Sequence, residues 1–223
     1  MLGYLQKEKY SRNDRRKPEP FESDLIDLKN NYNSNKHFRA KDTGEYVGIH
    51  NYQYLFPIGK GGFSKVWKVK EKRSNREYAV KEMQKARIIE KDSVTSVMNE
   101  RNLLGNLSHP FIINMHFAFQ NKEELFIVMD YLDGGNLKYH IKKRRKFEEN
   151  EARFLVANII AGLEYLRDHQ IVHRDIKPEN VVFDAQGYLR ITDLGISKQI
   201  KEPAKAEVCG TFGYMAPEVV LKN

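Results

Sequence analysis

The stretch that decides the fold is HRDIKPENVVFDAQGYLRITDLG, which occupies residues 173–195. Within it, two short apolar segments flank the turn residues DAQG, a pattern that predicts a β-hairpin. Because a hairpin closes at its turn, its two outer ends lie side by side, and Asn180 and Asp193 occupy these ends. Their side-chain oxygens are ligands that suit Mg²⁺. Asp175 and Lys177 lie on the segment that enters the hairpin, so we expect a base and a cation beside the metal.

A glycine-rich segment, GKGGFSKV at residues 59–66, lies between two predicted strands. Glycine allows the backbone to turn sharply and to approach a phosphate without a Cβ atom in the way. The segment is not a Walker A loop, because no Gly-Lys-Ser/Thr follows at the required spacing. It is not a dinucleotide-binding loop either, because a strand follows it instead of a helix. Taken alone, it fits a simple turn between strands as well as a phosphate-binding loop.

Lys81 ends the apolar segment YAVK at residues 78–81, where an unpaired ammonium group would be costly. It therefore needs a carboxylate, a phosphate or both as a partner. Glu100 is the candidate, because it lies three residues after Val97 and four before Leu104, on the same face of a predicted helix. Either residue alone would be taken as a surface charge. Together with the glycine-rich segment, the two predict an ion pair at a phosphate site.

The remaining apolar patterns predict an α+β fold, with a small lobe built on an antiparallel β-sheet followed by a helical lobe. We place the small lobe at residues 51–132 and an incomplete helical lobe at 133–223. Residues 1–50 are rich in basic and polar residues and are expected to be a disordered tail. The predicted elements are strands at residues 52–58, 66–69, 77–83, 112–119 and 125–131, and helices at 89–107 and 151–169.

Composition limits the class of protein without deciding it. No apolar run approaches the roughly 20 residues of a membrane span, so we expect no stable insertion into a membrane. A single cysteine, Cys209, excludes an internal disulfide and fits a reducing compartment, so we expect a cytoplasmic or nuclear protein. The net charge of +8 suits an acidic partner such as ATP. The same charge would suit nucleic acid or anionic lipid, but we expect no nucleic-acid partner.

Taken in order, these segments resemble the eukaryotic protein kinase family over residues 52–223. Lys177 and the sequence GTFGY at 210–214 resemble serine/threonine kinases more than tyrosine kinases. The sequences NER at 99–101 and CGT at 209–211 resemble the AGC group, with a YANK-like branch as the nearest match. The elements that carry the resemblance are the glycine-rich segment, Ala79-Val80-Lys81, Glu100, residues 173–180, residues 193–195 and Ala216-Pro217-Glu218.

The resemblance implies a bilobal fold with ATP and Mg²⁺ bound in the cleft between the lobes. Asp175 would take the proton of the acceptor hydroxyl, and Lys177 would stabilise the γ-phosphoryl group. Asn180 and Asp193 would bind Mg²⁺. The residues implied to contact or support the nucleotide are Ile58, Gly59, Lys60, Gly61, Gly62, Phe63, Ser64, Lys65, Val66, Ala79, Lys81, Glu100, Met129 as gatekeeper, Asp130 and Leu132 in the hinge, Glu179 and Val182.

The resemblance also implies how substrates and activation are controlled. Related kinases bind upstream arginines of the substrate through acidic side chains. At the corresponding positions Glu179 keeps a carboxylate and Asn136 does not, so a weakened arginine preference is expected. Glu207 stands where related kinases carry a phosphothreonine that pairs with Arg174 and a second basic residue, here Lys198. Glu207 is expected to order this loop without an upstream kinase, the alternative being a solvated loop residue.

Three further departures from the family pattern matter. Ser64 stands at the third glycine position, and Leu194 replaces the usual phenylalanine. The chain ends five residues after Glu218, so we expect a C-terminally truncated kinase domain. The expected function is a serine/threonine protein kinase that transfers the γ-phosphoryl group of ATP to protein hydroxyls. The alternative is a truncated or inactive kinase-like module that serves as a binding partner or scaffold.

Overall fold

The computed structural model describes residues 38–39, 46–200 and 208–221. Two short strands, β1 (Phe38–Arg39) and β2 (Tyr46–Val47), pair antiparallel, and a 3-10 helix, η1 (Ile49–Asn51), follows them. Both strands and the start of η1 fall within residues 1–50, which were predicted to be a tail. Residues 1–37 and 40–45 of that stretch lie outside the described residues, so the prediction of disorder stays a prediction there.

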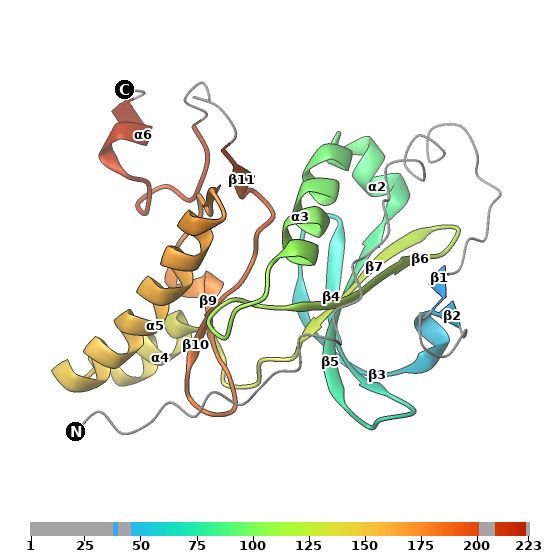
Figure 1. Cartoon of the computed structure of the whole chain (residues 1–223), viewed down its shortest axis with the longest axis horizontal. Coiled ribbons are helices and arrows are strands. Elements are labelled where there is room, and N and C mark those ends of the chain that lie inside the picture. Colours follow the sequence, from blue (N-terminus) through green and yellow to red (C-terminus); the bar gives the residue numbers. More distant parts are fainter. Residues whose placement is uncertain (1–37, 40–45, 201–207, 222–223) are drawn as a thin grey trace.

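The small lobe is built on one antiparallel sheet of five strands in the order β3-β4-β5-β7-β6. It occupies the right half of Figure 1. Both faces are partly covered, and the buried side chains of β5 and β7 supply much of the core. The predicted small antiparallel lobe is confirmed. Its strands are β3 (Tyr52–Lys60), β4 (Ser64–Glu71), β5 (Glu77–Gln84), β6 (Met115–Gln120) and β7 (Glu124–Asp130).

The single helix predicted at residues 89–107 is wrong, because two helices occupy this region: α2 (Lys85–Glu90) and α3 (Val94–Asn106). The helical conformation is interrupted at Asp92. Its φ of 48° lies in the left-handed region, which aspartate tolerates better than most residues. The amide of Ser93 then donates to the carbonyl of Ile88 over 2.9 Å. Apolar spacing continues across this break, so the pattern alone did not reveal it.

The strand predicted from residue 112 begins at Met115 instead, because the preceding residues pair with the other lobe. Ile112 forms an isolated parallel bridge with Ile191, and the amide of Ile113 donates to the carbonyl of Ile191 over 2.9 Å. This segment therefore links the two lobes through backbone hydrogen bonds.

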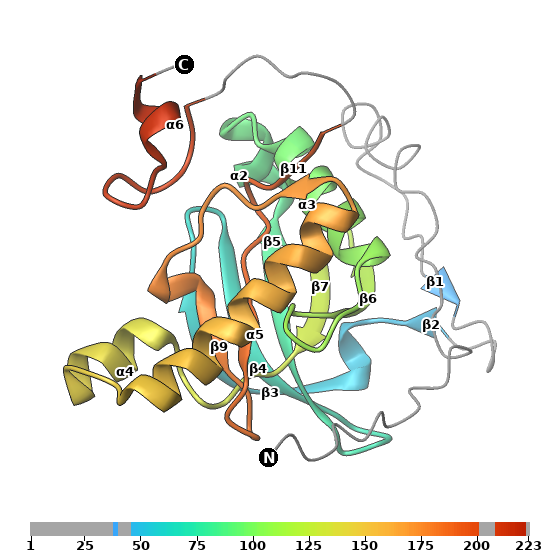
Figure 2. The same cartoon turned by 60° about the vertical axis from the view of Figure 1, so that its left-hand side comes forward.

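The second lobe begins with two helices, α4 and α5. Helix α5 packs against the predicted hairpin and against a short strand, β8 (Figure 2). The helix predicted at 151–169 is observed at Glu149–Asp168, and the hairpin forms as expected. The elements of this lobe are α4 (Leu137–Arg144), α5 (Glu149–Asp168), β8 (Ile171–Val172), η2 (Pro178–Asn180), β9 (Val181–Phe183), β10 (Leu189–Ile191), β11 (Lys198–Gln199) and α6 (Pro217–Leu221).

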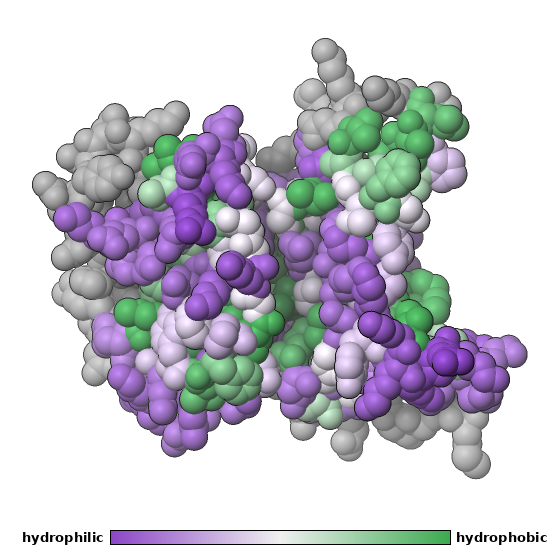
Figure 3. Space-filling view, turned by 180° about the vertical axis from the view of Figure 1, so that it is seen from behind, coloured by the Kyte–Doolittle hydropathy of each residue, from purple (hydrophilic) through white to green (hydrophobic). Residues whose placement is uncertain are grey.

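One hydrophobic cluster joins the lobes. It combines Leu104 of α3 with Leu166 of α5 and Leu194, which follows the hairpin. Leu194 is fully buried, so the leucine at this position fills a core site. On the face shown in Figure 3 a groove separates the two lobes, and apolar side chains lie at its floor. The functional residues predicted from the sequence come from the segments around this junction.

Candidate active site

Lys81 and Glu100 form the predicted ion pair. The Lys81 Nζ lies 2.6 Å from Glu100 Oε1 and 2.8 Å from Oε2, which joins β5 to α3. The Glu100 side chain is only 6% exposed, so its charge requires this partner. The pair fixes the position of a cation beside the sheet and leaves one further donor on the ammonium group for a ligand.

The glycine-rich segment connects β3 to β4 as a tight hairpin. Gly59 pairs with Val66 in the ladder, and the amide of Gly61 donates to the carbonyl of Ser64 over 2.8 Å. A Cβ atom on Gly61 would lie 2.6 Å from the Ser64 hydroxyl, so a side chain there would require the serine to change its rotamer. The Lys91 Nζ donates to the Gly62 carbonyl over 3.3 Å, which tethers the tip of the hairpin to the end of α2.

Asp175 is held by neighbours from two segments. The Lys177 Nζ lies 2.6 Å from Asp175 Oδ2, and the Thr211 hydroxyl donates to Oδ1 over 2.6 Å. Lys177 also donates to the Thr211 hydroxyl over 2.6 Å, which closes a triangle of three side chains. Gly210 makes this approach possible, because its φ is +119° and a Cβ atom there would lie 2.6 Å from the Arg174 carbonyl.

The charge state of Asp175 follows from these contacts. Burial would raise the pKa of Asp175, but the hydrogen bonds from Lys177 and Thr211 outweigh burial and hold the pKa below its usual value. The carboxylate is therefore ionised at neutral pH and fixed in direction. The sequence patterns GTFGY and CGT include Thr211, but they did not predict its contact with Asp175.

Asn180 and Asp193 lie at the two outer ends of the hairpin, as predicted. The amide of Thr192 donates to the Asn180 carbonyl over 2.8 Å, which holds the two ends together. The Asn180 amide nitrogen donates to Asp175 Oδ2 over 3.0 Å, so the amide oxygen points to the other side. A Cβ atom on Gly195 would lie 3.1 Å from Asp193 Oδ1 and 3.9 Å from Glu100 Oε2. The Asp193 and Glu100 carboxylates therefore both approach Gly195, which brings Asp193 into the same region as the Lys81 and Glu100 pair.

The backbone around these groups is held in an unusual conformation. Arg174 and Asp193 have φ values of 69° and 63°, in the left-handed region that non-glycine residues seldom adopt. His173 supports both segments, because its ring Nδ1 accepts from the Asp175 amide and its Nε2 donates to the Thr192 carbonyl over 3.0 Å. Burial lowers the pKa of His173, so the ring is neutral as this pattern requires. Such strain is concentrated at functional sites.

Residues 52–223 match the protein kinase domain. The chain belongs to the protein kinase family. It is 43% identical over 176 residues to serine/threonine-protein kinase sgk-1 of Caenorhabditis elegans, covering 78% of this chain and 38% of the relative. It is also 40% identical over 214 residues to Sgk1-A of Xenopus laevis, covering 95% and 47%, and 41% identical over 209 residues to Sgk1 of Gallus gallus, covering 92% and 46%.

These comparisons confirm the predicted resemblance to serine/threonine kinases of the AGC group. The YANK-like branch stays a prediction. The chain spans less than half the length of these relatives. In the described part of the chain, no helix has both the length and the apolar character that a membrane span requires.

The residues predicted to surround adenine are placed by the kinase sheet and hairpin. Val66 is the cross-strand partner of Lys81, and Ala79 is the partner of Met129. Val182 of β9 forms an isolated antiparallel bridge with Asn136, directly after the hinge. The hinge chain is held close to the hairpin at Gly134, where a Cβ atom would lie 2.5 Å from the Cβ of Phe183.

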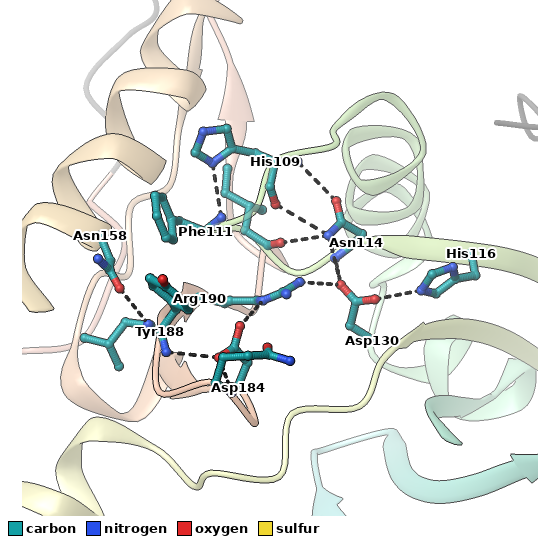
Figure 4. A network of polar contacts seen from close by, with 12 residues as sticks. His109, Phe111, Asn114, His116, Asp130, Asn158, Asp184, Tyr188 and Arg190 are labelled. Carbon is teal, nitrogen blue, oxygen red and sulfur yellow. Dashed lines mark hydrogen bonds and ion pairs between the residues drawn. The ribbon is translucent and has the colours of Figure 1, made fainter. Parts of the chain in front are cut away.

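The side chain of Asp130, a predicted hinge residue, takes part in a polar network. Its carboxylate accepts from Asn114 Nδ2 over 2.9 Å and from Arg190 Nη1 over 3.0 Å, and it contacts His116 Nε2 at 2.7 Å (Figure 4). Burial would raise the pKa of Asp130, but these contacts outweigh burial and keep the pKa below its usual value. The side chain is fully engaged, so only the backbone of Asp130 remains for a nucleotide.

The same network continues into the second lobe. Arg190 Nε donates to Asp184 Oδ2 over 3.2 Å, and Asp184 Oδ1 accepts from the amides of Gln186 and Tyr188 at the hairpin turn. Arg190 therefore connects the hinge carboxylate with the hairpin whose ends carry Asn180 and Asp193. No family motif contains Arg190 or Asn114, so motif reasoning missed them.

Glu179 and Glu207 complete the predictions for this site. The carboxylate of Glu179 already has a partner within the protein, because Lys138 of α4 forms an ion pair with Glu179 Oε1. Glu207 lies outside the described residues, so its predicted role in ordering the loop stays a prediction. Arg174, one of its predicted partners, donates from Nε to the Ile196 carbonyl over 2.6 Å.

Proposed function

We propose that this kinase domain transfers the γ-phosphoryl group of ATP to serine or threonine hydroxyls of protein substrates. The observation that carries the proposal is the triangle of Asp175, Lys177 and Thr211 beside Asn180, at the open end of the hairpin that also carries Asp193. We further propose that the domain comprises residues 51–223, with lobes at 51–132 and 133–223.

In this proposal the small lobe holds the nucleotide. Adenine lies between Val66 and Ala79 on one side and Val182 on the other, against the hinge backbone. The glycine-rich hairpin covers the phosphates with backbone amides, and Lys81 binds the α- and β-phosphates. Glu100 keeps the Lys81 ammonium in place, so the attraction to phosphate is not lost to side-chain motion.

The donor set fits magnesium bound together with a nucleotide. Within the described residues no three His, Cys, Asp or Glu side chains gather as a metal site. Asn180 and Asp193 offer two oxygen ligands, and phosphate oxygens would supply others, as Mg²⁺ prefers. Bound Mg²⁺ would neutralise charge that develops on the phosphates.

The second lobe orients the acceptor. Asp175 is ionised and held by Lys177 and Thr211, so it can accept a hydrogen bond from the acceptor hydroxyl and take its proton as transfer proceeds. Lys177 places a positive charge beside the group in transit. Phosphoryl transfer asks for little covalent work, so positioning and electrostatics supply most of the rate enhancement.

A second candidate is a binding or scaffold module without turnover. Catalysis is favoured because the residues of the nucleotide and acceptor sites are all present: Lys81, Asp175, Asn180 and Asp193.

The two candidates are separated by following labelled phosphate. The protein is incubated with γ-labelled ATP, Mg²⁺ and a mixed protein acceptor, and the labelled amino acids are identified after hydrolysis. The proposal expects label on serine and threonine. Binding of ATP with no transfer would favour the scaffold, and label confined to tyrosine would contradict the assigned substrate class.

A further inference from the structure

An ion pair lies at the rim of the acceptor site. Lys138, in the first turn of α4, contacts Glu179 Oε1. The Lys138 side chain is 61% exposed, whereas that of Glu179 is 30% exposed. Helix α4 is anchored here by Asn136, whose side chain accepts from the Tyr139 amide over 2.9 Å, so Lys138 extends from an ordered helix start.

The position of this pair relative to Asp175 follows from the chain. Glu179 lies in η2, between Lys177, which contacts Asp175, and Asn180, which also contacts Asp175. Tyr214 follows Thr211 by three residues and is close enough to Lys138 to contribute, after Glu179, to the raised pKa of the lysine. Lys138 is thus linked through Glu179 to the segment whose residues Lys177 and Asn180 contact Asp175.

Glu179 is poorly placed to receive a substrate arginine. Its Oε1 is already paired with Lys138, and its Oε2 is buried, with no hydrogen-bond partner among the described residues. A guanidinium group binds a carboxylate best through both oxygens at once. An arriving arginine would have to displace Lys138 and would still reach only one oxygen.

Lys138, unlike Glu179, is available to a substrate side chain. An ammonium group has three donors, and Glu179 occupies one of them, so donors remain directed to solvent. The following turn of α4 adds two exposed cations, Lys142 and Lys143. Helix α4 thus presents exposed positive charge next to η2, and Glu179 offers no free carboxylate there.

We propose that Lys138 is a specificity-determining residue that binds an acidic side chain near the phosphoacceptor, so that the substrates are acidic peptides and not arginine-rich ones. This inference rests on the proposed kinase activity. It assigns to Glu179 the role of holding Lys138 in place, where the family resemblance would assign it to the substrate.

The test compares peptides that differ at one position. Peptides with an acceptor serine carry Glu, Ala or Arg, in turn, at each position that flanks the serine, and kcat/KM is measured for each. At one or more positions near the serine, the Glu peptide should exceed the Ala peptide by about three-fold, as for an exposed ion pair. Lys138→Ala should remove this preference, and Lys138→Glu should reverse it in favour of Arg by about ten-fold.

Lys142→Ala is the matched control, because it removes the same charge one helical turn further along α4. It should retain most of the preference for the Glu peptide. Ratios between peptides within one variant cancel any general loss of activity. A wild-type preference for Arg, or an acidic preference that survives in Lys138→Ala, would overturn the inference. Absence of transfer to every peptide would instead count against the proposed function.

Discussion

At the residue scale, Thr211 connects the segment that precedes α6 to the loop that carries Asp175 and Lys177. Its hydroxyl donates to Asp175 and accepts from Lys177, each over 2.6 Å, so one small side chain fixes the direction of both charges. The sequence contained a signal for it, because the GT pair at 210–211 is part of the serine/threonine pattern. The contact itself could not be predicted, because 36 residues separate Thr211 from Asp175.

We predict that Thr211→Ala lowers kcat with little effect on ATP affinity. Hydrogen bonds to charged groups contribute about 1.5–3 kcal/mol, so the loss in kcat should be about 10- to 100-fold. Steady-state kinetics with a peptide acceptor, combined with nucleotide titration, measure the two effects separately. Thr211→Ser keeps the hydroxyl and should retain most of the activity. An unchanged kcat in Thr211→Ala would show that the triangle does not position the base.

Asp130 gives a prediction about pH. Its pKa is lowered in the folded state, so its charge stabilises the fold above the ordinary aspartate pKa of about 3.9. This stabilisation is lost as the pH falls through the lower, folded-state pKa. Asp130→Asn should therefore reduce the free energy of unfolding by about 1–3 kcal/mol at pH 7. The difference from wild type should shrink below about pH 4.

Urea unfolding of both proteins at pH 7, 5 and 3 measures this difference. Asp133→Asn is the control, because Asp133 lies on the same connection but is exposed. A difference between wild type and Asp130→Asn that stays constant down to pH 3 would argue against an ionised, paired carboxylate in the hinge.

At the scale of elements, the sequence predicted the helices and strands whose formation depends on adjacent residues. The hairpin at 181–191 and helix α5 formed as expected, because alternation, turn residues and helical spacing are properties of adjacent residues. The break between α2 and α3 depends on Asp92 entering the left-handed region, which the apolar spacing does not encode. Strand β6 starts late because Ile112 and Ile113 pair with Ile191, a partner far along the chain.

Arg190 of β10 belongs to no family motif, yet it links the hinge to the hairpin of the candidate site. It is the cross-strand partner of Val182, and its side chain bridges Asp184 and Asp130 (Figure 4). We predict that Arg190→Met raises the KM for ATP by about 3- to 10-fold, because the hinge and the hairpin lose their common partner. The KM for the peptide should change little.

Arg190→Lys is the matched variant, since it keeps the charge but lacks the planar fork that spans two carboxylates. Its KM for ATP should fall between wild type and Arg190→Met. Equal ATP KM values in all three proteins would mean that the bridge is a structural link with no effect on the nucleotide site.

At the scale of the whole molecule, the site is assembled from both lobes. Lys81 and Glu100 belong to the sheet and α3, whereas Asp175, Asn180 and Asp193 belong to the second lobe. The sequence predicted these residues because each lies in a recognisable pattern. It could not predict the Asp130 network or the Lys138 pair, since neither has a pattern and both depend on how distant segments meet.

The most direct test of the account measures ATP affinity and phosphoryl transfer in Lys81→Met, Asp175→Asn and Asp193→Asn. Lys81→Met and Asp193→Asn should abolish transfer, because we propose that these side chains hold the phosphates and the metal. Asp175→Asn should abolish transfer while binding ATP nearly as well as wild type, because the proposed role of Asp175 is on the acceptor. Normal transfer by Asp193→Asn would contradict the proposed phosphoryl-transfer site.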